Sequence, residues 1–463
     1  MPYAALRELT TIAGLADATD RTVAITGADP VVPTRYRVGA AASGTLAATG
    51  LAAAALWAMR GGRAQRIAVD LKAAAISLRS ARYLRIDGAR LPESWDRLSG
   101  FYPVRDGRWI SIHCNFPHHR DRALETLGAS DRGTAERASA AWQGEALEEA
   151  IIAAGGCAGF TRSAAEWRRH PQAASVAALP LVDITRIGDA PREALPPGDR
   201  PLAGVRVLDL TRVLAGPTCG KTLAEHGADV LKITAAHLPD SGAVELDTGI
   251  GKLSARLDLR DPAEAALLRE LVGTGDVFLQ SYRPGALAGR GLAPQDLAAL
   301  RPGIVCVSLS AWGHAGPWRD HRGFDSIVQN VSGMIEMPAD GKRPRLMPVS
   351  AIDYVSGYLM AFGAMVALAR RAGEGGSWLV RVSLARTGQW IVDRGILPAA
   401  ALAAIPDDLA DDEIARLSSE SVMEDGTRLR HLAPVVGLSE TPPRWVRPPA
   451  PLGFHPPAWP ARP

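Results

Sequence analysis

The sequence predicts an α/β protein with an open parallel sheet and a smaller α+β domain, and three observations support this. Gly188–Gly204 is rich in Pro, Gly and charge, which is typical of a domain boundary. After it, Val205–Leu210 and Ala228–Ile233 have strand patterns, and a helix opened by Pro217 separates them. Strand, helix and strand in this order predict a right-handed parallel unit. Before the boundary, Phe101–Cys114 instead reads as an antiparallel hairpin.

Composition narrows the functional classes. The 463 residues suffice for two or three domains, and 47% hydrophobic with 22% charged residues is typical of a soluble globular protein. A net charge of +3 without an arginine-rich arm argues against a nucleic-acid partner. The four cysteines form no C-x-x-C pair and the N-terminus has no signal-peptide pattern, so we expect a cytoplasmic protein.

The N-terminal half begins with residues 1–33, which we expect to be irregular. Tyr36–Met59 then has a helical pattern, and Ile67–Leu71 has a strand pattern. Ala41–Met59 carries no charge and is nearly long enough to span a bilayer. It consists mostly of Ala, Gly, Ser and Thr, so we expect a buried helix and no membrane partner.

Helices follow the hairpin at about His118–Leu127, Gly144–Ala154 and Ser163–Arg169. The histidines of this region lack the spacing of a metal cluster, so we expect structural or surface roles for them and no metal. They are His113, His118, His119 and His170.

Beyond the boundary the alternation of strands and helices continues. The next segments are strand Arg256–Leu259, helix Pro262–Gly273, strand Val277–Leu279, helix Pro294–Leu300 and strand Ile304–Leu309. A long apolar helix with Asp353 at its head comes next, and strand Trp378–Leu384 follows it. The local pattern favours Asp353 as a helix N-cap, because Asp is preferred there. A carboxylate at the head of a buried helix is also well placed for chemistry.

The region around Asp353 has a counterpart 313 positions earlier. Gly44 corresponds to Gly357, and Gly50 to Gly363, at this offset. Both regions run helix, glycine turn and short strand, which indicates a degenerate internal repeat. Asp353 falls on Ala40, so the first region keeps the packing pattern and lacks the acid.

Ligands of open α/β sheets bind beyond the carboxyl ends of the strands. Three loops leave those ends: Thr211–Pro217, Ser281–Ala286 and Ser310–Pro317. The first runs into a helix N-terminus, which favours a phosphate. No G-x-G-x-x-G motif follows the first strand, so an NAD site is disfavoured. The candidate phosphate-neutralising residues are Arg212, Lys252, Arg283 and Arg290.

Ordered motifs of the C-terminal half resemble a known family. Pro201–Ile233 (PLAGVRVLDLTRVLAGPTCGKTLAEHGADVLKI) resembles the opening of the family III CoA-transferases. The similarity continues through LDLRDPAE at Leu257, GDVFLQSYRPGAL at Gly275, RPGIVCVSLSAWGHAGP at Arg301 and RGFDSIVQNVSG at Arg322. It ends with the Asp353 helix and the strand after it.

The resemblance implies a Rossmann-like CoA-binding domain whose catalytic residue is Asp353. Its carboxylate would attack an acyl-CoA thioester and pass through anhydride and aspartyl-CoA intermediates to a carboxylic acid acceptor. The substrates implied are an acyl-CoA and a carboxylic acid, with no permanently bound cofactor and no metal, in a homodimer. Implied CoA contacts are Arg212, Val213, Leu214, Ala215, Ser281, Tyr282 and Ala286, with the basic residues Lys252, Arg283 and Arg290 nearby.

The order of the segments suggests a rearranged fusion of this family. Residues 1–90 resemble a degenerate repeat of the helix and strand that follow the aspartate, and 91–195 resemble the family's small domain. Residues 196–390 form the predicted CoA-binding domain, and 391–463 an acidic and then proline-rich tail.

Departures from the family pattern leave two alternatives. Ser281 stands where the family often has Asn, and Thr234-Ala235 replace an acidic residue and the Arg or Pro after it. The first alternative is therefore a paralogue that binds CoA and does not catalyse a reaction. An acyl-CoA racemase is the other, but racemases of the family place a His where this chain has Phe324.

Overall fold

The computed structural model describes residues 1–15, 22–92, 95–338 and 342–462. Its largest element is a seven-stranded sheet of order β11-β10-β9-β12-β13-β14-β8, in which the first six strands are parallel. The open parallel sheet predicted from the sequence is therefore confirmed. The strands are β8 (Asp183–Gly188), β9 (Arg206–Leu210), β10 (Asp229–Thr234), β11 (Lys252–Arg256), β12 (Val277–Gln280), β13 (Val305–Ser310) and β14 (Ser377–Ser383).

Alternate residues of the central strands form two hydrophobic cores on opposite faces of this sheet. On one side Val207, Val305 and Val380 face helices α10 (Ala215–Glu225) and α15 (Ala351–Glu374). On the other side Leu208 and Cys306 face α12 (Pro262–Gly273) and α13 (Pro294–Leu300). Burial on both faces explains why these strands read as nearly continuous apolar runs.

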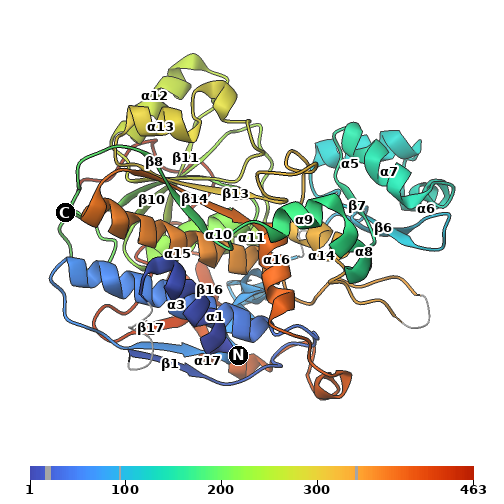
Figure 1. Ribbon diagram of the computed structural model, residues 1–463, viewed down its shortest axis with the longest axis horizontal. Coiled ribbons are helices and arrows are strands. Elements are labelled where there is room, and N and C mark those ends of the chain that lie inside the picture. The colour runs from blue at the N-terminus through green and yellow to red at the C-terminus, as the bar shows by residue number, and fades with distance from the viewer. Residues whose placement is uncertain (16–21, 93–94, 339–341, 463) are drawn as a thin grey trace.

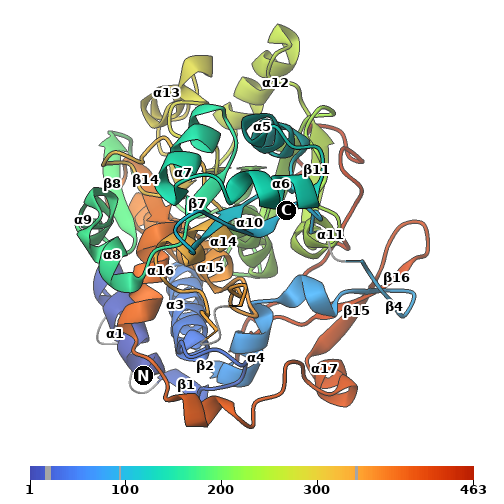
Figure 2. The same cartoon turned by 90° about the vertical axis from the view of Figure 1, so that its right-hand side faces the viewer.

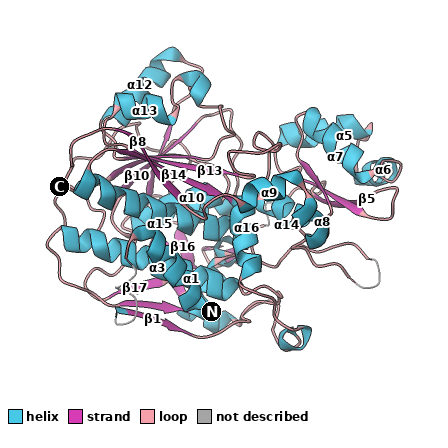
Figure 3. Ribbon diagram, viewed as in Figure 1, coloured by secondary structure: helices cyan, strands magenta, loops and turns pink. Residues whose placement is uncertain are grey.

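The molecule continues below α10 and α15 as two further layers. Helices α1 (Pro2–Ala13) and α3 (Val38–Met59) pack beneath α15, and a small sheet closes that side (Figures 1 and 3). That sheet has the order β1-β2-β17, from β1 (Val23–Thr26), β2 (Ile67–Asp70) and β17 (Val436–Leu438). Helices α4 (Leu71–Ser77) and α16 (Leu384–Asp393) follow β2 and β14 directly.

Three details of the sequence prediction are wrong. The strand predicted over Arg256–Leu259 is instead β11, which ends at Arg256, because Lys252 inside the strand is buried against Asp209.

The segment 1–33 is not wholly irregular, because α1 buries Leu6 and Leu9 and β1 pairs with β2. Helix α10 begins at Ala215, two residues before Pro217. Proline is tolerated there because the N–H groups of a first helical turn need no partner within the helix.

Residues of α3 and α15 that are 313 positions apart in the sequence pack against their neighbours in a similar way. A side chain at Gly44 would collide with Ala5 of α1, and one at Gly357 with Ala215 and Thr218 of α10. The sheet edges also correspond, because β17 of the C-terminal half lies antiparallel on β2 and β8 of the N-terminal half lies antiparallel on β14. Each half of the chain therefore completes the sheet of the other.

Residues 100–177 form a separate α+β unit to one side of the large sheet (Figure 1). The predicted hairpin is confirmed as β5 and β6, and β7 extends it antiparallel. The predicted helices are confirmed as α5, α7 and α8. The bounds are β5 (Gly100–Pro103), β6 (Trp109–Ile112), β7 (Ala158–Phe160), α5 (Pro117–Leu127), α6 (Arg132–Ser139), α7 (Gly144–Ala153), α8 (Ala164–Arg169) and α9 (Pro171–Ala177).

The C-terminal segment predicted as a tail contains regular structure. Strands β15 (Ser418–Val422), β16 (Arg428–Leu432), β3 (Arg85–Ile86) and β4 (Ala89–Arg90) form a sheet in the order β15-β16-β3-β4, which Figure 2 shows at the side of the molecule. The remaining helices described in this half are α11 (Ala243–Gly249), α14 (Asp325–Val331) and α17 (Asp411–Arg416), with short 3-10 turns at Ala288–Arg290 and Ala399–Leu402. In the N-terminal half a 3-10 turn, Ser80–Tyr83, lies between α4 and β3.

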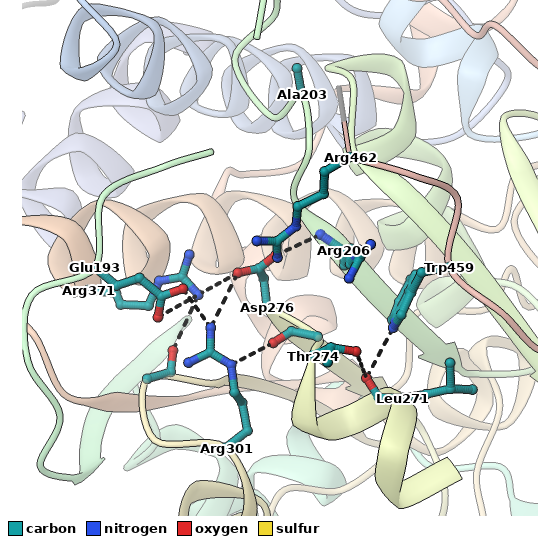
Figure 4. A network of polar contacts seen from close by, with 12 residues as sticks. Glu193, Ala203, Arg206, Leu271, Thr274, Asp276, Arg301, Arg371, Trp459 and Arg462 are labelled. Carbon is teal, nitrogen blue, oxygen red and sulfur yellow. Dashed lines mark hydrogen bonds and ion pairs between the residues drawn. The ribbon is translucent and has the colours of Figure 1, made fainter. Parts of the chain in front are cut away.

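Buried charge ties the amino ends of the strands to the last residues of the chain (Figure 4). Asp276, fully buried, accepts hydrogen bonds from the Arg371 guanidinium at the end of α15 and from the backbone N–H of Arg206, both at 2.9 Å. Arg301 and Arg462 approach the same carboxylate at 3.7 and 3.4 Å. This network lies at the edge of the sheet opposite to the predicted site.

Helices α3 and α15 are long and apolar enough to cross a membrane. In the most apolar window of each, 89% and 100% of the residues are buried inside the molecule. Their apolar character therefore matches a role as core helices.

Candidate functional site

Asp353 lies in the first turn of α15 and does not cap the helix, so the N-cap interpretation is wrong. Ser350 occupies the N-cap position, and within the described part of the chain the Asp353 carboxylate has no hydrogen-bond partner. The residue is only 8% exposed. A carboxylate left without a structural partner in this position is available for a ligand.

A second buried carboxylate caps α15 in its place. Asp325, the first residue of α14, accepts a hydrogen bond from the backbone N–H of Asp353 at 2.9 Å. Its other oxygen accepts from the side-chain amide of Gln329, whose own oxygen accepts from the N–H of Met347 at 2.8 Å. These bonds hold the loop that enters α15 and thereby fix the position of Asp353.

The two carboxylates differ in how well they carry charge. Burial raises the pKa of Asp353 well above its ordinary value, and the charge of Asp325 raises it further. Burial also raises the pKa of Asp325, but the hydrogen bonds that Asp325 accepts oppose this rise. Asp325 therefore holds negative charge more readily than Asp353 does.

A cavity of about 400 Å³ opens above Asp353. Both halves of the chain line it. The N-terminal half contributes Arg79, Arg82, Arg90, Leu91, Trp95, His113 and Asn115, and the C-terminal half contributes Val213, Leu214, Val244, Phe324, Asp325, Met347 and Asp353, among others. The site thus depends on segments that are far apart in the sequence.

A second cavity of about 260 Å³ adjoins the first, since Val213 and Phe324 line both. The predicted loops meet here: Arg212, Val213, Ser281, Tyr282, Arg283 and Ala286 all line this cavity. The Ser281 hydroxyl accepts a hydrogen bond from the N–H of Arg212 at 3.3 Å. Val213 has a left-handed backbone with φ of 69°, a strained conformation of the kind that clusters at functional sites.

The charge of the second cavity suits phosphate. Of the residues that the structure describes, four arginines and no acidic residue line it. Sequence reasoning identified Arg212 and Arg283 but missed Arg319 and Arg322, which follow the predicted loop Ser310–Pro317. That loop leaves a strand end on the same sheet edge, so extending it by a few residues would have found both.

The other predicted contacts lie outside the two cavities or at their margin. Leu214 lines the Asp353 cavity, and Ala215 is buried where α10 begins. Lys252 is buried and paired with Asp209 at 2.7 Å. The Arg290 guanidinium donates to the carbonyl of Leu259, away from both cavities.

His113 is a further site residue that sequence reasoning assigned to structure. It is 4% exposed, lines the Asp353 cavity and stacks on Phe324 with ring centroids 3.8 Å apart. Burial lowers its pKa to about 3, so the imidazole is neutral at neutral pH. No signal in the sequence links it to Phe324, since 211 positions separate them.

Comparison with known proteins places these features in a family. The family model described as CoA-transferase family III matches residues 11–193 and 202–418. Succinyl-CoA--D-citramalate CoA-transferase of Chloroflexus aurantiacus is 35% identical over 201 residues, which cover 40% of this chain and 49% of that protein. Succinate--glutarate CoA-transferase of Agrobacterium fabrum is 36% identical over 197 residues, 38% of this chain and 49% of that protein.

Among solved structures, a hypothetical protein from Mycobacterium tuberculosis is 30% identical, with a TM-score of 0.39. The match covers 42% of this chain and 59% of that chain. This chain spans about half the length of the two curated relatives named above.

Proposed function

Because the chain belongs to CoA-transferase family III, we propose that it transfers CoA from an acyl-CoA donor to a carboxylic acid, with Asp353 as the nucleophile. One observation carries this proposal: the buried carboxylate of Asp353 has no partner among the described residues and faces a cavity that adjoins an arginine-lined one. The relatives named above support a CoA-transferase, and their names suggest succinyl-CoA as the first donor to test.

Coenzyme A would occupy the arginine-lined cavity. Its phosphates would contact Arg212, Arg283 and Arg322, since charge-assisted hydrogen bonds to phosphate are among the stronger polar contacts in proteins. The pantetheine arm would pass Val213 and Phe324, which line both cavities, and bring the thioester to Asp353.

The chemistry would proceed through covalent intermediates on Asp353. The ionised carboxylate attacks the thioester carbonyl, the C–S bond breaks, and an acyl-aspartyl anhydride and a CoA thiolate result. The thiolate attacks the aspartyl carbonyl, which releases the donor carboxylate and leaves an aspartyl-CoA thioester. The acceptor carboxylate attacks this thioester, the C–S bond breaks, and a second anhydride and a CoA thiolate result. The thiolate then attacks the acceptor's carbonyl, which gives the new acyl-CoA and free Asp353.

The surroundings of Asp353 would favour the attack in two ways. Burial removes water from the carboxylate, and a desolvated carboxylate is a stronger nucleophile than a hydrated one. The peptide dipole at the start of α15 favours negative charge in the first turn, which offsets part of the desolvation cost.

The experiment that tests the proposal is chemical trapping. The protein is incubated with succinyl-CoA and then hydroxylamine, and the peptide containing Asp353 is analysed by mass spectrometry. We expect an aspartyl hydroxamate at Asp353 in the native chain and none in Asp353→Asn. A native chain that binds CoA and acquires no label would support the CoA-binding paralogue without catalysis.

The racemase alternative rests on His113, which stacks on Phe324 in the cavity of Asp353. Neutral imidazole could exchange a proton beside the thioester carbonyl, but a pKa of about 3 makes His113 a weak base. Deuterium uptake into the acyl group without trapping at Asp353 would favour this alternative over CoA transfer.

Location and assembly remain predictions. We expect the protein in the cytoplasm and as a homodimer, and light scattering of the purified chain measures the latter.

A further inference from the structure

We propose that Arg79, Arg82 and Arg90 bind a second carboxylate on the acyl group, so that this site takes dicarboxylic acyl-CoA substrates. The inference rests on the proposed function, because it assumes that the thioester reaches Asp353. All three arginines line the Asp353 cavity and come from the N-terminal half of the chain.

Hydrogen bonds fix Arg79 beside the first turn of α15. The carbonyl of Leu78 accepts from the N–H of Ser350 at 3.0 Å, and the hydroxyl of Ser80 lies 3.0 Å from that of Tyr354. The neighbours of Arg79 on both sides are thus bonded to residues that flank Asp353. We call Arg79, Arg82 and Arg90 together the arginine wall. These hydrogen bonds position the wall relative to the Asp353 carboxylate, which would react.

The wall has more positive than negative charge. Asp408 is the carboxylate that pairs with it, at 2.9 Å from Arg82 and 3.5 Å from Arg79. Arg90 is exposed, and its side chain has no partner within the described part of the chain. Among the residues that the structure describes, the acidic ones that line the cavity are Asp325 and Asp353. Arg79 and Arg82 therefore share one carboxylate and Arg90 has no described partner, so a ligand anion would complete the balance.

Arg79 also has unused hydrogen-bonding capacity. Its side chain is 6% exposed, and its two terminal nitrogens contact the carbonyl of Asp407 and the carboxylate of Asp408. Its Nε is buried without a partner in the described structure. A buried guanidinium donor left unsatisfied costs free energy, and the described part of the protein does not fully satisfy the Arg79 guanidinium.

The anion that binds here belongs to the acyl group. The phosphates of CoA have their own arginines in the second cavity, beyond Val213 and Phe324. With the thioester at Asp353, the acyl chain extends into the first cavity, where the apolar Leu91 and Trp95 lie close in sequence to Arg90. A short methylene chain that ends in a carboxylate matches this sequence of apolar and cationic surfaces.

The test compares succinyl-CoA with butyryl-CoA, which has the same chain length and lacks the second carboxylate. The readout is the rate of hydroxylamine trapping at Asp353, which depends on the donor alone. We expect the native chain to prefer succinyl-CoA by about tenfold or more, equivalent to about 1.4 kcal/mol, and Arg82→Gln/Arg90→Gln to lose this preference. Arg79 is left in place because it also holds the chain at Asp407 and Asp408.

Two further variants separate recognition from folding. Arg82→Lys/Arg90→Lys retains positive charge, and we expect it to recover most of the preference. Arg428→Gln removes an exposed arginine from β16, which belongs to the same sheet as Arg90 but lies outside the cavity. We expect this variant to keep the native preference for succinyl-CoA. Equal rates for both donors in the native chain would overturn the inference. So would an equal loss for both donors in the double Gln variant, since the wall would then bind the CoA moiety.

Failure of the proposed function can be told apart from failure of this inference. If neither donor labels Asp353, calorimetric titration of the CoA-loaded protein with succinate and with butyrate still tests the arginine wall. Succinate binding that exceeds butyrate binding, and that the double Gln variant loses, would uphold the subsite. Equal binding of the two acids would reject it.

Discussion

The close contact between α15 and α10 makes a prediction that links stability to ligand binding. A Cβ atom at Gly357 would lie 2.5 Å from the carbonyl oxygen of Ala215 and 2.7 Å from Cβ of Thr218. Ordinary contacts begin at 3.4 Å, so in Gly357→Ala one helix must move by nearly 1 Å. Because the obstacle includes backbone, no side-chain rotation can relieve it.

The magnitude follows from a matched variant on the same helix. A Cβ at Gly373 would meet no atom within 4 Å. Overpacking costs about 1–3 kcal/mol, and replacing Gly by Ala within a helix gains up to about 1 kcal/mol. The gain in helix propensity largely cancels between the two variants, so we expect Gly357→Ala to be less stable than Gly373→Ala by about 1–3 kcal/mol.

The assay is urea unfolding followed by tryptophan fluorescence, with CoA titration in parallel. Helix α10 begins directly after Val213 and Leu214, so displacement of its first turn should also weaken CoA binding in Gly357→Ala. Gly373→Ala should bind CoA like the native chain. Equal stability of the two variants would refute the reasoning, because it would mean that the helices do not touch at Gly357.

Three other predictions follow from the charged residues. Asp325→Asn removes the charge that raises the pKa of Asp353, so the pH below which hydroxylamine trapping at Asp353 slows should decrease. A pH profile of the trapping rate that does not shift would contradict this. Asp276→Asn should cost about 3 kcal/mol in urea unfolding by leaving Arg371 buried without its counter-ion, whereas removing the partly exposed cation in Arg462→Gln should cost under about 1 kcal/mol. In calorimetric CoA titrations, Arg212→Gln should weaken binding about tenfold while Arg290→Gln leaves it unchanged, and equal effects would place CoA elsewhere.

The parallel sheet was predictable because its signals are local. Strands β9, β10, β12 and β13 contain short apolar runs that alternate with helical patterns, and the order of these segments fixes the winding. Strand β11 (KLSAR) is not an apolar run, and its position was predicted wrongly. The loops at the strand ends followed from the same rule, and most of the residues predicted on them do meet in one cavity.

Pairings between distant segments could not be read in this way. Strands β8 and β17 carry weak patterns of their own, and their places are set by the edges of β14 and β2, which the other half of the chain provides. Lys252 looked like a free cation because its partner Asp209 lies 43 positions earlier, on a different strand.

Contacts between distant residues at the site could likewise not be predicted from the sequence. The motif that contains Asp325 was visible, but its role as the cap of α15 depends on a hydrogen bond to a residue 28 positions later. The arginines at 79, 82 and 90 belong to a half that the sequence related to packing alone. Their place beside Asp353 follows from the bonds of Leu78 and Ser80 to the start of α15.

Transfer of isotope from substrate to enzyme tests the central role of Asp353 most directly. The protein is incubated with succinyl-CoA and succinate labelled with ¹⁸O in its carboxylates, and the peptide containing Asp353 is weighed by mass spectrometry. Collapse of the second anhydride leaves one oxygen of the acceptor on the enzyme, so we predict one ¹⁸O in the Asp353 carboxylate after a single turnover, up to two after many turnovers, and none without acyl-CoA. Exchange of CoA between the two succinates with no ¹⁸O at Asp353 would contradict the account.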